Sequence, residues 1–184
     1  MMPVILVLYH SSQGSVSAMA DEIYDTLSAL GAEVRLRTFV QRQAHDVVVT
    51  KQDLIECDGL AFGSPTRFGM MAAQAKTFWE TTSDLWLKGQ LIDKPACVFS
   101  SSSSMHGGNE ATLLNLSLPL LHHGMMLMGV PYDVPELLST TSGGTPYGAS
   151  HVAGMENCPE LTETEVKICR AIATRLFNVS KKLL

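Results

Sequence analysis

The sequence predicts one α/β domain built on an open parallel sheet with helices on both faces. Residues 4–9 are continuously apolar, which is typical of a strand buried on both faces of a parallel sheet. Strand-like and helix-like segments then alternate along the chain. The 184 residues, 46% of them hydrophobic, suffice for one well-buried core and are too few for two ordinary domains, so we expect residues 1–184 to form a single domain.

The expected strands are short apolar segments bounded by turn residues: 4–9, 33–39, 58–65, 94–99 and 124–131. The second alternates between polar and apolar residues, which favours a more exposed position. The third ends in glycine and proline, and the fourth runs into five serines. Parallel strands need right-handed crossovers, and five strands in so short a chain favour an open sheet over a barrel.

The expected helices are segments whose apolar residues recur at helical spacing: 15–30, 71–82, 109–123 and 162–182. Gly31 ends the first, and Pro119 is expected to kink or break the third. Thr162 and Glu165 have the spacing of a capping box at the start of the last helix. Residues 136–154 show neither period and are expected to form a long polar loop.

Charge, hydropathy and cysteine content exclude several classes of function. The net charge of −5 argues against a nucleic-acid-binding surface. No segment approaches the roughly 20 apolar residues of a membrane span, and the N-terminus lacks a cleavable pattern. The four cysteines have no metal-ligand spacing, so we expect no metal site and mostly buried, reduced thiols. These features predict a cytoplasmic protein without nucleic-acid or integral membrane contact.

Polar, glycine-containing turns follow three expected strands, and ligands of open parallel sheets bind beyond the carboxyl ends of strands. The turns are SSQGSV (11–16), GSPTRFGM (63–70) and SSSSSMHGG (100–108). The first matches neither GxxxxGK[ST] nor GxGxxG, so an anion there would bind main-chain N–H groups and the hydroxyls of Ser11 and Ser15. Taken alone, this turn fits an ordinary βα connection equally well.

The other two turns offer groups suited to a planar ligand. Arg67 could meet a charged or planar group, and Phe68 offers an aromatic face. Taken alone, this turn fits a solvated Arg67 beside a core Phe68 better. The serine-rich turn presents many N–H and O–H donors to the edge of a polar ring. Together the three turns predict a site for a phosphate joined to a large, flat, hydrogen-bonding ring, and flavin mononucleotide (FMN) fits that description.

Five segments in order resemble the WrbA family of flavodoxin-like NAD(P)H:quinone oxidoreductases: GSPTRFGMMAAQ, LWLKGQL, HGGNEATLL, LLHHGM and GGTPYGAS. The similarity runs from Val4 to about Gly154. It implies a flavodoxin-like three-layer sandwich with a five-stranded parallel sheet of order 2-1-3-4-5. It also implies bound FMN and a homotetramer, with a dimer as the alternative.

The resemblance also implies roles for individual residues. The cofactor-binding residues would be Ser11, Ser12, Gln13, Gly14, Ser15, Val16, Pro65, Thr66, Arg67, Phe68, Ser101, Ser102, Ser103, Ser104, Met105, His106 and His123. His123 would also be the catalytic residue, with a structural role beside His122 as the alternative. Trp86 and Gln13 would contact the nicotinamide or the quinone. Trp86 or residues 143–149 would come from a neighbouring chain; a core or interface role for Trp86 stays open.

The implied reaction is two-electron reduction of a quinone to a hydroquinone by NADH or NADPH, with hydride passing through FMN in ping-pong order. Two departures from the family pattern are Gln13, where a tyrosine is frequent, and Ser103, where glycine is usual. Two alternatives remain open: a one-electron carrier of the flavodoxin type and a non-catalytic binding module. Among the other histidines, His10 and His45 are expected to be structural or solvated, and His151 to lie on the surface of a loop.

Overall fold

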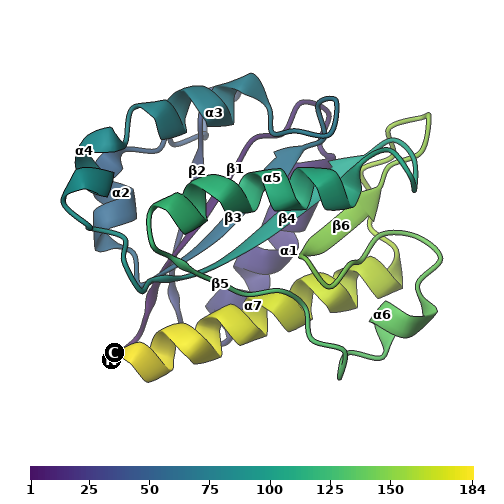
Figure 1. Cartoon of the computed structure of the whole chain (residues 1–184). Helices are drawn as coiled ribbons and strands as arrows, with labels where there is room; N and C mark the ends of the chain where they lie inside the picture. The colour runs from purple at the N-terminus through teal and green to yellow at the C-terminus, as the bar shows by residue number, and fades with distance from the viewer.

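A parallel sheet lies between two layers of helices in the computed structural model, which describes residues 1–184 (Figure 1). The strands are β1 (Val4–Tyr9), β2 (Glu33–Thr38), β3 (Gly59–Pro65), β4 (Pro95–Ser102), β5 (Met126–Leu127) and β6 (Ala149–Val152). The helices are α1 (Ser15–Ala29), α2 (Lys51–Glu56), α3 (Ala73–Glu80), α4 (Ser83–Leu87), α5 (Asn109–His122), α6 (Glu136–Ser139) and α7 (Glu163–Leu183). The order β2-β1-β3-β4-β5 confirms the predicted topology.

Each face of the sheet has its own buried core because successive side chains of a strand point to opposite faces. In β1, Ile5 and Val7 pack in the core formed with α1 and α7, whereas Leu6 and Leu8 pack in the core formed with α3 and α5. All four side chains are inaccessible to solvent. This two-sided burial explains why residues 4–9 show no polar alternation.

The fifth strand differs from the prediction because two short segments share its place. Met126–Leu127 pair with the start of β4, and Ala149–Val152 pair with its end. The residues between them leave the sheet, form α6 and return, with the Val130 amide donating to the Pro146 carbonyl. The predicted strand 124–131 therefore has the right place but is only two residues long, and the predicted featureless loop 136–154 is wrong because it contains α6 and β6. Segments of two and four residues are too short to show a period.

The helices also differ in detail from the sequence pattern. The expected helix 71–82 is α3, followed by the separate short α4. Helix α5 continues past Pro119 to His122, so the proline, in the last turn, does not break it. The unpredicted α2 begins with a capping box formed by Thr50 and Asp53. The capping box predicted for α7 is present, with both of its hydrogen bonds. None of the helices combines the length and apolar character needed to cross a membrane.

Candidate functional site

The carboxyl ends of β1, β3 and β4 open into one polar cavity of about 270 Å³. It is lined by all three predicted turns and by one further segment. The lining residues are Ser11, Ser12, Gln13, Ser15, Val16, Pro65, Thr66, Arg67, Ser101, Ser102, Ser103, Ser104, Gly107, Ala153 and Asn157. The arrangement follows from the parallel sheet, because strands that run the same way end at one edge.

Hydrogen bonds join the three turns at this edge. The Arg67 guanidinium donates to the Ser12 hydroxyl at 2.9 Å and to the Thr66 carbonyl at 2.9 Å. The Thr66 amide donates to the Ser101 carbonyl at 2.9 Å. Arg67 therefore connects the second turn to the first, and Thr66 connects it to the third, so the mouth of the cavity has a defined shape before any ligand binds.

The first turn presents main-chain donors that the chain itself does not use. Gly14 adopts φ 98°, a left-handed conformation that favours glycine, and precedes the first residue of α1. Its amide donates to the Ser11 hydroxyl, whereas the amides of Ser12, Ser15 and Val16 donate to no group in the chain. Free amides at a helix N-terminus form an anion site. The turn therefore fits the phosphate of FMN without a lysine.

The third turn offers a second set of free donors. The amides of Ser103, Ser104 and Met105 make no hydrogen bond within the chain. The Ser102 hydroxyl donates to the Ser104 carbonyl at 2.6 Å, which holds the turn in its bent shape. Free N–H groups beside buried serines of β4 suit the carbonyl and nitrogen acceptors along the edge of a flavin ring. The cavity thus offers free donors suited to a phosphate at one turn and to a polar ring at another.

Several predicted cofactor contacts lie outside the cavity. Phe68 is 99% exposed and has φ 54°, so its ring extends into solvent. Met105 and His106 are also exposed at the tip of the third turn and do not line the cavity. Gly14 lies beside it and shapes the first turn. The sequence correctly grouped the turns, but it did not show which way each side chain points.

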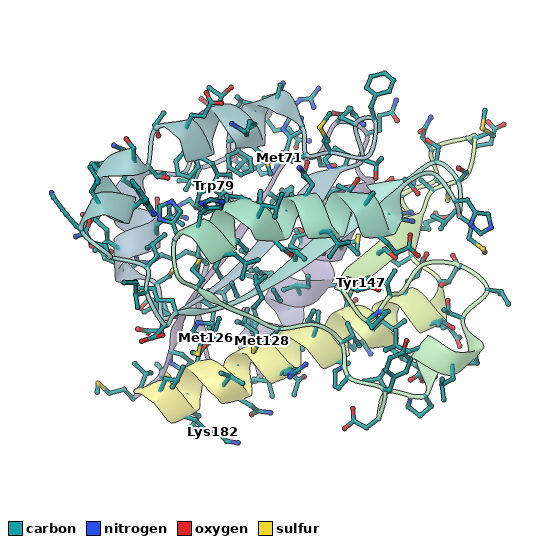
Figure 2. The ribbon with its side chains drawn as sticks, in the orientation of Figure 1. Met71, Trp79, Met126, Met128, Tyr147 and Lys182 are labelled. Atoms are coloured by element: carbon teal, nitrogen blue, oxygen red, sulfur yellow. The ribbon has the colours of Figure 1, made fainter.

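His123 and Trp86 line a different pocket, of about 470 Å³, where α3, α4 and α5 meet. Helix α5 starts at the cavity described above, and its 14 residues carry the chain about 20 Å away before His123. Figure 2 shows Met71 and Trp79 of this second pocket between α3 and α5. Within one chain, the structure therefore does not bring His123 or Trp86 to the cavity formed by the turns.

The second pocket contains two buried polar atoms without partners. The Thr82 hydroxyl donates to the Trp79 carbonyl, so it accepts from His123 Nε2 at 2.8 Å. This hydrogen bond leaves His123 Nδ1 as an unpaired acceptor, and Trp79 Nε1 is an unpaired donor. Burial lowers the pKa of His123, and the nearby His122 lowers it further. His123 is therefore a neutral imidazole with one buried nitrogen that has no hydrogen-bond partner.

The fourth wall of the cavity was missed by the sequence analysis. Ala153 and Asn157 line it, directly after β6. His151, expected on the surface of a loop, is instead 1% exposed and lies on β6, because this short strand completes the buried sheet beside β4. The one signal for this wall was a four-residue strand within a polar stretch, which is too short to be recognised by its period.

Comparison with known proteins places the chain among flavoproteins. The model of the family described as "NADPH-dependent FMN reductase" matches residues 3–132. Two relatives called NAD(P)H dehydrogenase (quinone) are each 38% identical over 199 positions. The one from Geotalea daltonii is matched over 97% of both chains, and the one from Chromohalobacter salexigens over 99% of both.

Solved structures show the same fold. A flavodoxin, WrbA-like protein from Agrobacterium tumefaciens superposes with a TM-score of 0.73 at 23% identity over 98% of both chains. A flavodoxin from the domain Archaea gives a TM-score of 0.69 at 19% identity over 97% of this chain and 99% of the other. At these identities the likeness establishes the flavodoxin-like architecture.

Proposed function

Because the chain belongs to the NADPH-dependent FMN reductase family, we propose that it is an FMN-dependent NAD(P)H:quinone oxidoreductase that reduces quinones to hydroquinones. The observation that carries this proposal is the polar cavity at the strand ends, where two turns present free main-chain amides. Full-length similarity to two quinone dehydrogenases supports the choice of reaction. The cavity supplies the place where the cofactor of that reaction would bind.

The residues of the cavity divide into two groups by the part of FMN they would hold. Ser11 to Val16 would bind the phosphate through the amides at the start of α1. Thr66, Arg67 and Ser101 to Ser104 would bind the ring. When bound, FMN supplies a ring that accepts a hydride from NADH or NADPH and delivers it to the quinone. The Arg67 charge and the free amides would stabilise negative charge near the ring.

We also propose that His123 and Trp86 serve the site from a second copy of the chain. The support is an apolar band along the outer side of α5. Leu114, Leu118 and Leu121 are each at least 50% exposed and share one side of the helix, and Trp86 beside them is 52% exposed. Such a band is typical of a protein interface. An interface along this band would bring the second pocket, with the exposed Trp86 at its edge and His123 behind it, to a neighbour's cofactor, and the resemblance favours a tetramer.

The reaction is tested with protein reconstituted with FMN and assayed with NADH or NADPH and benzoquinone. We expect a bound flavin spectrum and nicotinamide oxidation that depends on the quinone. No nicotinamide oxidation at full FMN loading contradicts the proposal and favours an electron carrier. Protein that does not bind added FMN favours a non-catalytic module.

The shared site is tested by complementation between two variants. Arg67→Ala removes a ring-binding group, and His123→Ala removes the group offered to the neighbour. If each site combines residues of two copies, mixing and reassembling the two weak variants restores part of the activity, because some sites then receive both intact residues. Activity that stays at the level of the separate variants, although mixed assemblies form, contradicts the shared site.

The assembly itself is tested by placing a charge in the apolar band. Leu118→Glu should lower the molar mass measured by light scattering, because a buried unpaired carboxylate is costly at an interface. Leu138→Glu, at an exposed site on α6, is the matched control and should leave the mass unchanged. A Leu118→Glu protein with the wild-type mass would exclude this band as the interface.

A further inference from the structure

A buried charged pair lies behind the fourth wall of the cavity. His151 on β6 is 1% exposed, and Glu165 in the first turn of α7 is inaccessible to solvent. Glu165 Oε2 accepts from His151 Nδ1 at 2.9 Å and from the Thr162 amide at 2.8 Å. Its Oε1 accepts from the Ser142 hydroxyl and from the amides of residues 143 and 152, at 2.7–3.0 Å. Five donors hold this carboxylate in its ionised form.

The partners of His151 determine its protonation state. Its Nδ1 faces the Glu165 carboxylate, and its Nε2 lies 2.9 Å from the Cys158 carbonyl oxygen. Both partners can only accept hydrogen bonds, so both ring nitrogens must carry hydrogen and the ring is an imidazolium. Burial alone would lower the pKa of His151, but the hydrogen bonds to Glu165 and Cys158 and the Glu165 charge raise it overall.

The imidazolium holds the segment that forms the fourth wall. After β6, the Ala153 amide donates to the Ser102 carbonyl, and the Cys158 amide donates to the Ala153 carbonyl, both at 2.8 Å. The His151 Nε2–H bond to the Cys158 carbonyl fixes the far end of this turn. Ala153 and Asn157 of the turn line the cavity, and Pro159 lies against Gly14 of the phosphate-binding turn.

We infer that doubly protonated His151 is a positioning residue that holds the turn Ala153–Pro159 against the cofactor cavity and thereby strengthens FMN binding. The inference rests on the proposed function, because FMN is the ligand it concerns. His151 does not line the cavity and acts through the turn. A neutral His151 keeps the Nδ1–H that faces the Glu165 carboxylate, so losing its proton removes the Nε2–H bond to the Cys158 carbonyl, which is the bond that holds the turn.

Raising the pH should therefore loosen the turn and weaken FMN binding. The charged side chain that acts on the His151 ring is Glu165 of α7. The neighbours of His151 on the other two elements are uncharged: Ser101 on β4 and the Cys158 carbonyl in the turn. Cys169 of α7 stays protonated because burial raises the pKa of its thiol. Glu165 stays ionised throughout, so within the buried pair the group that changes charge above neutral pH is His151. The Cys158 thiol and Glu160 at the end of the turn lie at the surface, and the His151→Gln variant separates their effects from that of His151.

Two measurements on the wild-type protein test the inference: the dissociation constant of FMN, from flavin fluorescence, and hydrogen–deuterium exchange of residues 153–159 in the apoprotein. Both are followed upward from about pH 7, where a phosphate ester is already mostly dianionic. We expect FMN to bind about tenfold more weakly once His151 is neutral, as for the loss of one hydrogen bond to a charged group. Intrinsic-rate-corrected exchange in the turn should rise over the same pH range.

The variant His151→Gln should bind FMN weakly at all these pH values and lose the pH dependence. His45→Gln, which removes an exposed imidazole, is the control and should behave as the wild type. If His151→Gln does not fold, the pH dependence of FMN affinity and of exchange in the wild-type protein still tests the inference. Intact FMN binding with no pH-dependent change in affinity or exchange overturns this inference alone, whereas wild-type protein that binds no FMN overturns the proposed function.

Discussion

Replacing Glu165 by glutamine should remove a large, acid-sensitive part of the stability of the apoprotein. Burial would raise the pKa of this carboxyl, but hydrogen bonds from His151, Thr162, Ser142 and Val152 lower it from 4.5 to about 2. A carboxyl with a lowered pKa stabilises the fold above its unfolded-state pKa, and this contribution is lost as the pH falls from about 4.5 towards 2. His151 has the opposite pH dependence, because its stabilisation of the fold is lost as the pH rises through its raised pKa.

The size of the Glu165 contribution follows from its pKa. The difference between 4.5 and about 2 corresponds to about 3 kcal/mol at neutral pH. At pH 3 the unfolded chain is already mostly protonated at this position, so about 1 kcal/mol should remain. Glutamine has a similar shape but no charge. Its side-chain oxygen can still accept hydrogen bonds, whereas its NH2 group would face groups that are themselves donors.

Urea unfolding of the apoprotein at pH 7, 4 and 3 measures this effect. Glu165→Gln should lower the free energy of unfolding by about 3 kcal/mol at pH 7, and the difference from the wild type should narrow to about 1 kcal/mol by pH 3. Glu163→Gln, in the same turn of α7 but exposed, is the matched control and should follow the wild type. A Glu165→Gln difference that is equally large at pH 7 and pH 3 would refute the electrostatic reasoning.

Three further predictions concern the sheet and its edges. Gly63→Ala places a methyl group about 2.2 Å from the ring of buried Phe99, so it should cost about 1–3 kcal/mol and lower Tm. Lys94→Met leaves three carbonyl oxygens at the end of α2 without their shared ammonium donor, and urea unfolding should show a loss of about 1–3 kcal/mol. Iodoacetamide at pH 8 should label Cys158 alone in the native protein, because the other three thiols are buried and burial raises their pKa values. Mass spectrometry would show one adduct per chain, and four after unfolding; extra native adducts would contradict the burial.

The polar cavity at the strand ends was largely predictable because its parts are local. Ser11 to Val16, Thr66, Arg67 and Ser101 to Ser104 each follow a recognisable strand, and parallel strands end at a common edge. The free amides of the first turn also follow from local structure, since a helix N-terminus always leaves its first N–H groups unpaired. No long-range contact had to be known to group these residues.

The second pocket and the fourth wall depend on contacts between distant segments. His123 shares a recognisable motif with the predicted family, yet the length of α5 puts it about 20 Å from the cavity of its own chain. His151 was expected at the surface because its strand is four residues long, and its partner Glu165 lies 14 residues further along the chain. Neither the distance of His123 from the cavity nor the separation between His151 and Glu165 can be interpreted from the sequence pattern alone.

The sequence alone determined the parallel sheet, the order of its first four strands and of the four long helices, and the turns that meet at its edge. These features arise from apolar periodicity and capping within short windows, as in residues 4–9 and in the capping box of Thr162 and Glu165. The tertiary structure decided the division of the fifth strand, the outward direction of Phe68 and the burial of the charged pair. These depend on which distant surfaces pack together, because only packing determines whether a polar side chain meets water or a buried partner.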